Sequence, residues 1–257
     1  MTDILLRDDC DGIVTLTLHR PAARNALSIP LMQALDAQLQ SIAADPAARV
    51  VIIAANGSAF CAGHDLREVR ATPTREAYET LFTTCSVLMQ RIVHLPKPVI
   101  AQVQGVATAA GCQLVASCDL AVAGEAARFA TPGVDIGLFC STPMVALSRA
   151  VGRKAAMEML LTGDMVPPWR ARELGLVNRV VADAELAEAA RALAMQIAAK
   201  SPLTLAIGKE AFYRQLQMPQ PLAYDYAQEV MSSNAADADA QEGMQAFLDK
   251  RPARWRG

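Results

Sequence analysis

Two segments of this chain pass from an apolar run through a turn into a pattern of helical period. In the first, the run 97–103, which contains three β-branched residues, leads to the small residues of 105–111, and apolar residues then recur at helical spacing up to Cys118. We predict a strand that ends at Gly105 and a helix that begins near Ala110. Such a turn lets a ligand approach N–H groups that a helix N-terminus leaves unpaired, although small residues there can equally serve close packing.

The second segment repeats this order. Val50–Ala55 is an almost wholly apolar run of strand length, and the turn 56–63 follows it and leads to His64. A partial negative charge is stabilised at the N-terminal end of a helix. If N–H groups from the two turns converge, they form an oxyanion hole, which stabilises the enolate or tetrahedral anion of a thioester carbonyl.

The composition indicates a globular protein and excludes several partners. Apolar residues make up 53% of the 257 residues and charged residues 19%, and the formal net charge is −2, so the chain can bury a large core and offers no basic surface for nucleic acid. Met1–Cys10 is charged and lacks the apolar core of a signal peptide, and no run approaches the roughly 20 apolar residues of a membrane span. We therefore expect a cytoplasmic protein with no membrane partner.

The cysteine and histidine spacing gives no support for a metal site. The six cysteines include no C-x-x-C pair, and the three histidines form no H-E-x-x-H motif. The sequence also lacks G-x-G-x-x-G and G-x-x-x-x-G-K-[ST], the motifs typical of nucleotide sites. We expect no metal, and no cofactor other than a group carried by the substrate itself.

The remaining pattern predicts an α/β fold. Strand-like runs 4–6 and 13–18 flank an Asp-Gly step, which indicates a hairpin. Ser28–Ala44 and Glu76–Leu95 carry apolar stripes of helical period. Strand and helix patterns then alternate as far as residue 199, as in α/β proteins.

Beyond Ser201-Pro202 the pattern is helical only. We therefore predict two domains, a core in residues 1–200 and an α-helical lobe in residues 201–257.

The sequence resembles the enoyl-CoA hydratase/isomerase family, the crotonase superfamily, from about Asp3 to Arg256. The matching runs keep the family's order and spacing, and they are Ala59–Leu66, Gly105–Ala107, Gly111–Leu114, Cys118–Ala123 and Phe129–Pro132. The resemblance implies a ββα spiral core with an acyl-CoA site, and a C-terminal lobe that forms a homotrimer or a dimer of trimers. It also implies that the oxyanion donors are the backbone N–H groups of His64 and Ala110.

The resemblance leaves the reaction open. In the family's hydratases two glutamates hold a water and exchange protons with the substrate. The matching positions here are Gln113 and Gly133, and neither can transfer a proton, so we expect weak or absent hydration. Changing both residues to glutamate is expected to raise hydration if both carboxylates then face one water. Within the family, long runs around these two positions resemble a branch that shares the glutamine and the glycine.

Other candidates for proton transfer or nucleophilic attack have alternative roles. Ser141 matches the position of an aspartate in some isomerases and dehalogenases, but neither it nor Cys140 has an obvious histidine base. Asp135 can act as an acid or cap a turn. His64 can transfer a proton or contribute only its N–H, and an Ala-Gly-His-Asp run also occurs in decarboxylating members of the superfamily. Asp65 is expected to cap the helix that follows it.

Five further residues are implied to bind coenzyme A, as part of the substrate. Ala62 and Leu66 would lie around the adenine, and Arg24 would pair with a phosphate or remain a solvated surface residue. Phe247 and Lys250 would reach the coenzyme A bound to a neighbouring subunit, or simply form a helix terminus.

Two hypotheses of function follow. The first is an acyl-CoA enzyme of the lyase, isomerase or decarboxylase type, or a weak hydratase, that uses the oxyanion hole without the two glutamates. The second is a non-catalytic acyl-CoA binding or assembly protein.

Overall fold

A computed structural model describes residues 4–256; residues 1–3 and 257, at the outer ends of the two predicted domains, lie outside the described residues. The main sheet has six strands in the order β1-β2-β3-β5-β7-β9. Its strands, in chain order, are β1 (Leu5–Cys10), β2 (Ile13–Leu18), β3 (Val50–Ala55), β5 (Val99–Val103), β7 (Leu120–Gly124) and β9 (Arg179–Val181). β1 and β2 form the predicted antiparallel hairpin, and the other neighbours pair in parallel.

A second sheet was not predicted. It contains three parallel strands in the order β4 (Ala59–Cys61), β6 (Val106–Thr108) and β8 (Arg128–Ala130). The first two strands lie within the segments that the sequence analysis treated as turns. Each follows a strand of the main sheet and precedes a helix, so that the chain repeats a strand, strand, helix unit. This is the ββα spiral that the resemblance implied.

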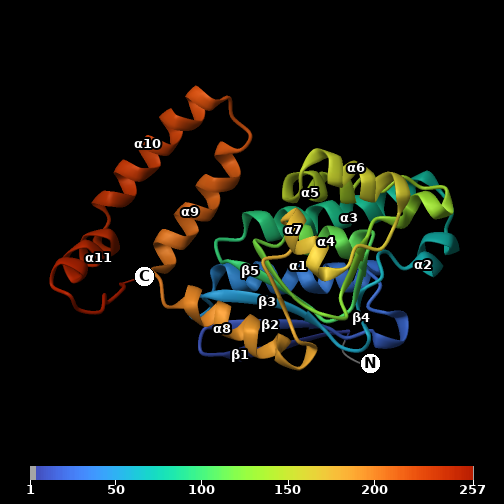
Figure 1. The fold of residues 1–257 in the computed structure, drawn as a ribbon, viewed down its shortest axis with the longest axis horizontal. Helices are drawn as coiled ribbons and strands as arrows, with labels where there is room; N and C mark the ends of the chain where they lie inside the picture. The colour runs from blue at the N-terminus through green and yellow to red at the C-terminus, as the bar shows by residue number, and fades with distance from the viewer. Residues whose placement is uncertain (1–3, 257) are drawn as a thin grey trace.

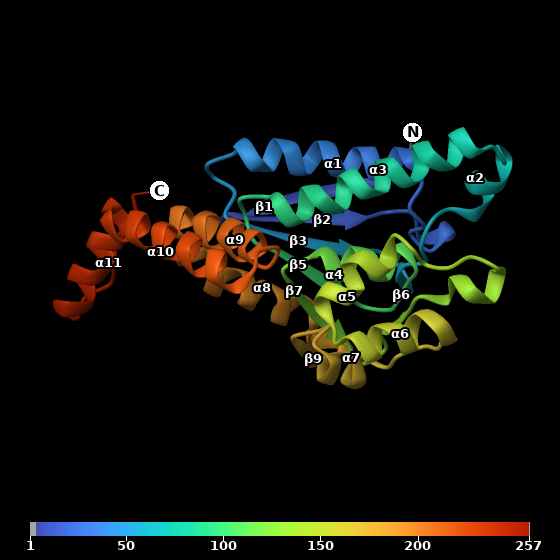
Figure 2. The ribbon, with the colours of Figure 1, turned by 90° about the horizontal axis from the view of Figure 1, so that it is seen from above.

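Helices cover both faces of the main sheet. α1 (Ile29–Ala44) and α3 (Arg75–His94) pack on one face, and α8 (Leu186–Ala198) covers the other (Figure 2). α1 begins as predicted, because the Ser28 hydroxyl accepts a hydrogen bond from the Leu31 N–H at 3.4 Å. The shorter helices are α2 (Leu66–Ala71), α4 (Ala110–Ser117), α5 (Pro143–Ala150), α6 (Arg153–Thr162) and α7 (Pro168–Leu174), with the 3₁₀ turns η1 (Pro21–Ala23), η2 (Pro132–Ile136) and η3 (Asp183–Glu185).

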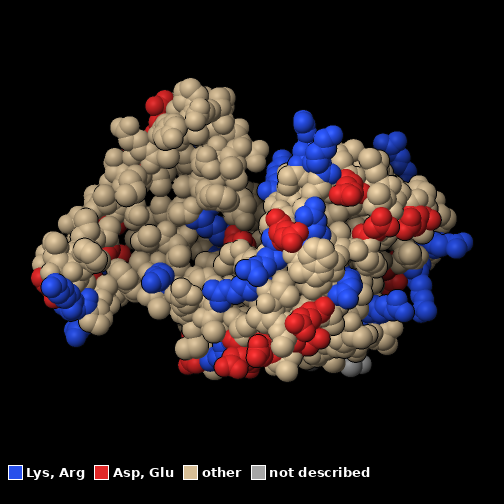
Figure 3. Space-filling model, in the orientation of Figure 1, with Lys and Arg blue, Asp and Glu red and all other residues tan. Residues whose placement is uncertain are grey.

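Three helices after residue 201 project from one end of the core and form what we call the helical arm, residues 202–248 (Figure 1). They are α9 (Pro202–Gln215), α10 (Gln220–Ala236) and α11 (Ala238–Leu248). Within the described chain, neither α9 nor α10 has a fully buried residue. Most of the arm surface seen in Figure 3 is uncharged. The exposed large apolar side chains of the arm are Phe212, Leu216, Leu222, Tyr224, Met231, Met244, Phe247 and Leu248.

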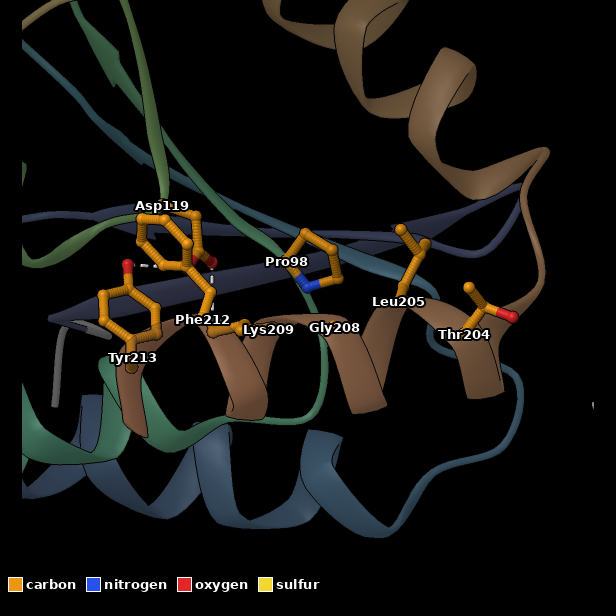
Figure 4. A pocket seen from close by; sticks show the side chains of 8 residues that line it. All are labelled: Pro98, Asp119, Thr204, Leu205, Gly208, Lys209, Phe212 and Tyr213. Carbon is orange, nitrogen blue, oxygen red and sulfur yellow. Dashed lines mark hydrogen bonds and ion pairs between the residues drawn. The ribbon is translucent and has the colours of Figure 1, made fainter. Parts of the chain in front are cut away.

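A buried polar cluster attaches the arm to the core. Lys209, on α9, donates to the Asp119 carboxylate at 2.6 Å and to the carbonyls of Ile92 and Lys97 at 2.9 and 3.0 Å. The Tyr213 hydroxyl donates to the other oxygen of Asp119 at 2.9 Å (Figure 4). Burial lowers the pKa of Lys209 and raises that of Asp119, and the attraction between the two opposes both shifts. Every acceptor and donor of this ion pair is thus matched by the fold.

Candidate active site

The two predicted oxyanion turns lie side by side because β4 and β6 pair in parallel. Cys61 on β4 is the partner of Ala107 on β6, and a Cβ built on Gly63 would lie 3.6 Å from the Ala110 nitrogen. The Gly63 carbonyl accepts from the Leu27 N–H at 2.7 Å, and the Asp65 N–H donates to the Leu27 carbonyl at 3.2 Å. These bonds fix the backbone on both sides of His64.

The N–H groups of His64 and Ala110 are both free to bind an acceptor. Among residues 4–256, no carbonyl or side chain accepts a hydrogen bond from either group. The Ala110 group is the first of α4, where a helix leaves its N–H groups unpaired. The close approach of α4 to β4 requires glycine at position 111, since a Cβ there would collide with the Cys61 carbonyl oxygen.

Ala109, immediately before the second donor, has a strained backbone that the sequence did not reveal. Its φ and ψ are 49° and −116°, a conformation that glycine adopts freely and alanine only at a cost in energy. Its N–H donates to the Ala130 carbonyl on β8 at 2.9 Å, which holds this conformation in place. Such strain is typical of functional sites.

We expect Ala109→Gly to raise the free energy of unfolding by about 1 kcal/mol, because relief of the strain exceeds the entropy that glycine loses on folding. Urea denaturation measures the change. Ala110→Gly is the matched control: Ala110 is already helical, so this variant is expected to lose about 0.5–1 kcal/mol. Equal destabilisation by both changes would contradict the strain.

The His64 side chain lies beside its own N–H donor with both ring nitrogens shielded from solvent. Neither nitrogen has a hydrogen-bond partner among the described residues. The ring meets Phe82 of α3 edge to face, at 5.6 Å between centroids and an interplanar angle of 72°. Burial lowers the pKa of His64, because it disfavours the charged imidazolium. The nearby backbone of Leu27 opposes part of this shift, but it lies outside hydrogen-bonding geometry with the ring. The imidazole is therefore neutral near pH 7.

Gln113 is buried one turn into α4, between α4 and α3. Its side-chain oxygen lies 3.9 Å from the Cys85 sulfur, a weak contact, and only 4% of the residue is exposed. Gln113 also lines a cavity of about 700 Å³ between α3, α4, α5 and α9, together with Met89, Val145 and Arg149. Sequence reasoning missed this cavity, because it is formed by helices distant in sequence.

Gly133 has no room for a side chain, which corrects the expectation for the double glutamate change. A Cβ at this position would lie 2.5 Å from the Leu138 carbonyl oxygen and 2.8 Å from the Cys140 sulfur. The segment after η2 folds back over Gly133, and the Leu138 N–H donates to the Gly133 carbonyl at 2.9 Å. A glutamate at this position would displace that segment instead of facing a water shared with position 113.

The remaining candidates on this segment have no base beside them in the described chain. The Ser141 hydroxyl is exposed and donates to the Phe139 carbonyl at 3.3 Å. Cys140 is buried, and burial raises the pKa of its thiol, which disfavours the thiolate. Asp135 is exposed and has its carboxylate beside Gly163 of the turn after α6.

The exposed Arg24 and the half-buried Ala62 form one rim near the donor turns. The Ala62 N–H donates to the Arg24 carbonyl at 3.1 Å, and Leu66 begins α2 with 51% of its surface exposed. The fully buried Asn25 supports this rim: its amide donates to the carbonyls of Asn56 and Ala59, each at 2.8 Å. The sequence analysis gave Asn25 no role.

Asp65 caps α2, as predicted, by accepting from the Arg67 N–H at 3.2 Å. Its other oxygen accepts from Arg20 at 2.8 Å, and this hydrogen bond lowers the pKa of Asp65. Arg20 and Asp65 are thus paired with each other and are not free to bind a ligand's charge.

Phe247 and Lys250 lie at the end of α11, and Figure 1 shows α11 and α2 at opposite ends of the molecule. Phe247 is 83% exposed. The chain therefore does not bring these two residues to its own Arg24, Ala62 and Leu66.

Within residues 4–256, no three His, Cys, Asp or Glu side chains gather as metal ligands, and no helix has the length and apolarity needed to cross a bilayer.

The fold described above agrees with comparisons to known proteins. The family model described as enoyl-CoA hydratase/isomerase matches residues 8–257. The chain belongs to this family. Among solved structures, enoyl-CoA hydratase from Mycobacterium smegmatis superposes with a TM-score of 0.96 and is 54% identical, covering 99% of this chain and 100% of that one.

The branch within the enoyl-CoA hydratase/isomerase family is also as predicted. Enoyl-CoA hydratase domain-containing protein 3, mitochondrial, from Xenopus laevis is 48% identical over 244 residues, 95% of this chain and 83% of the relative. The crystal structure of human enoyl-CoA hydratase domain-containing protein 3 has a TM-score of 0.95 and 45% identity, and covers 98% of this chain and 100% of that one. These likenesses confirm the crotonase fold with a C-terminal helical region.

The names of these relatives correct one expectation. The vertebrate proteins of this branch are called mitochondrial, so the prediction of a cytoplasmic protein is wrong. The prediction relied on the lack of an apolar signal-peptide core. The lack of an apolar core does not distinguish cytosolic from mitochondrial proteins, because mitochondrial transit peptides are amphipathic and rich in arginine and have no such core either.

Proposed function

We propose that this family member binds acyl-CoA thioesters and polarises the thioester carbonyl between the N–H groups of His64 and Ala110. The observation that carries the proposal is that these two N–H groups lie on adjacent turns and have no acceptor among residues 4–256. Donors held in place before the reaction stabilise the negative charge that develops on the carbonyl oxygen. Loss of one such donor typically costs about 10²–10³ in rate.

The reaction we propose is one in which the enolate forms without two glutamates. Gln113 cannot take a proton, and position 133 has no space for a side chain. Decarboxylation needs the oxyanion hole and one proton donor, and a lyase or isomerase reaction of this kind can use one group that both removes and returns a proton, whereas ordinary hydration in this family uses two groups around a water. The same lack of carboxylates favours the second candidate, a non-catalytic acyl-CoA binding or assembly protein.

Turnover of enoyl-, malonyl- and methylmalonyl-CoA thioesters, together with calorimetry of their saturated analogues, tests this proposal. Turnover of any thioester in the panel supports the enzyme, and tight binding without turnover supports the binding protein. If none of the acyl-CoAs binds, the oxyanion site has no such ligand and both candidates fail.

We further propose that the chain divides into domains 1–200 and 201–257 and that the second domain mediates a homotrimer or a dimer of trimers. The exposed apolar side chains of the helical arm support a contact between copies. Because α11 and α2 lie at opposite ends of the molecule, a neighbouring subunit would have to bring Phe247 and Lys250 to the nucleotide of coenzyme A. Light scattering of the wild type tests the assembly.

Lys250→Ala is expected to weaken binding of an acyl-CoA by about 1–3 kcal/mol, the contribution of a charge-assisted hydrogen bond to phosphate. Binding of the corresponding pantetheine thioester, which lacks the nucleotide, should not change. Calorimetry with both ligands gives the comparison, and Lys154→Ala, which removes an exposed lysine from α6, is the control. Equal weakening of both ligands would show that Lys250 is only part of a helix terminus.

A further inference from the structure

We propose that the imidazole of His64 determines specificity: it hydrogen-bonds to an uncharged oxygen on the acyl group, so that acyl-CoAs with a hydroxyl or keto oxygen near the thioester are preferred. This inference rests on the proposed function, because it concerns the acyl group held at the same two N–H donors. It goes beyond the backbone role of His64 and assigns a role to its ring.

The first argument is that the ring is buried without a partner. Both ring nitrogens of His64 are shielded from solvent, and neither reaches a hydrogen-bonding group among the described residues. Buried polar atoms in proteins are nearly always hydrogen-bonded, because an unpaired one destabilises the folded state. Two such atoms on one ring, beside a site for a thioester, indicate that a ligand provides the missing partner.

The second argument concerns the position of the ring. In the free protein the ring packs edge to face on Phe82, at 5.6 Å between centroids, with both nitrogens shielded, so a ligand reaches a nitrogen when the ring turns from this contact. The bridge to Leu27 holds the backbone of His64 meanwhile. The ring and the N–H donor belong to the same residue. A ligand atom that hydrogen-bonds to the ring therefore lies only a few bonds from the thioester carbonyl carbon, whose oxygen accepts from the backbone N–H.

The third argument concerns charge. Burial lowers the pKa of His64, so at neutral pH the ring offers one donor and one acceptor, which suits a hydroxyl group. The carboxylates nearest in sequence are engaged elsewhere: Asp65 is paired with Arg20, and Glu68 accepts from the Ile29 N–H at 3.0 Å. Among residues 4–256 no carboxylate hydrogen-bonds to the ring to orient it as a general base, and Arg20 is not free to neutralise a charged acyl group.

Calorimetry with butyryl-CoA, (R)- and (S)-3-hydroxybutyryl-CoA, acetoacetyl-CoA and malonyl-CoA tests the inference. We expect the wild type to bind at least one hydroxy or keto ligand about three- to tenfold more tightly than butyryl-CoA, as one neutral hydrogen bond provides. In His64→Leu, which keeps the backbone N–H, the ratio should fall to about one. His64→Gln, which retains a donor and an acceptor, should recover part of the ratio.

A second readout separates this role from packing. His64→Leu removes two unpaired polar atoms, so the ligand-free variant should melt about 2–4 °C higher than the wild type, even though it loses the preference. A lower melting temperature would indicate that the ring has partners in the free protein and would count against the inference.

The remaining outcomes are distinguishable from one another. Binding of butyryl-CoA and the oxygenated ligands with equal affinity by the wild type would overturn the inference and leave the proposed function intact. A preference that persists in His64→Leu would do the same. If the wild type prefers malonyl-CoA and His64→Leu abolishes that preference, the ring binds a carboxylate, and the inference of an uncharged oxygen is overturned. If no acyl-CoA binds, butyryl-CoA included, the proposed function itself is overturned, and this inference with it.

Discussion

Lys209→Met is expected to lower the free energy of unfolding by about 3–5 kcal/mol, the effect of removing one partner of a buried ion pair. The side chains of Lys209 and Asp119 are 7% and 16% exposed, so the carboxylate that remains is left largely buried without its cation. The same change removes the bonds to the carbonyls of Ile92 and Lys97. Urea denaturation measures the loss, and limited proteolysis near residue 201 reports release of the helical arm.

Two controls identify the cause. Lys154→Met removes an exposed lysine from α6 and should change stability by less than about 0.5 kcal/mol. Lys209→Met combined with Asp119→Leu removes both charges and should recover most of the lost stability, because an apolar pair can replace a buried ion pair. If the double variant is no more stable than Lys209→Met, the geometry of the cluster matters more than its charge.

Hydration of crotonyl-CoA is expected to be at least about 10⁴-fold slower than in a hydratase that carries both glutamates. Each acid or base contributes roughly 10²–10⁴ in rate, and this chain has Gln113 and Gly133 at the two positions. Loss of the absorbance of the conjugated thioester measures the rate. A rate within about tenfold of an ordinary hydratase would mean that another group in this chain transfers the protons.

Restoring the glutamates should not restore hydration. Gly133→Glu is expected to destabilise the protein, since its Cβ would lie 2.5 Å from the Leu138 carbonyl oxygen. Gly152→Glu is the matched control, because no atom lies within 4 Å of a Cβ built there. Fast hydration by a stable Gly133→Glu variant combined with Gln113→Glu would show that the segment after η2 moves aside readily.

The elements that the sequence predicted are those with long periodic patterns or a clear boundary residue. The buried stripe of α1 after the Ser28 cap and the apolar run Val50–Ala55 gave a helix and a strand near their observed bounds. The second sheet was missed because Ala59–Cys61 and Val106–Thr108 have three residues each, too few to show an alternating pattern. The sequence analysis interpreted their small residues as parts of turns, but only the residues next to these strands form turns.

The site was predictable as a pair of backbone donors but not as a set of side chains. Motif spacing indicated His64 and Ala110, whereas the strain at Ala109 depends on its bond to β8 and leaves no trace in a single sequence. The contact of Gln113 with Cys85 depends on how α4 packs on α3. The lack of space at Gly133 depends on the path of the segment that follows η2.

The pairing of β4 with β6 has a consequence for how proteins of this architecture diverge. The separation of the two donor turns is determined by hydrogen bonds between strands. The connections 72–74 and 137–142 belong to neither sheet. A lineage can therefore lengthen, shorten or replace these connections without altering the distance between the donors. The spacing of the two donor turns and the length of these connections are then separate traits, which one scaffold can inherit independently.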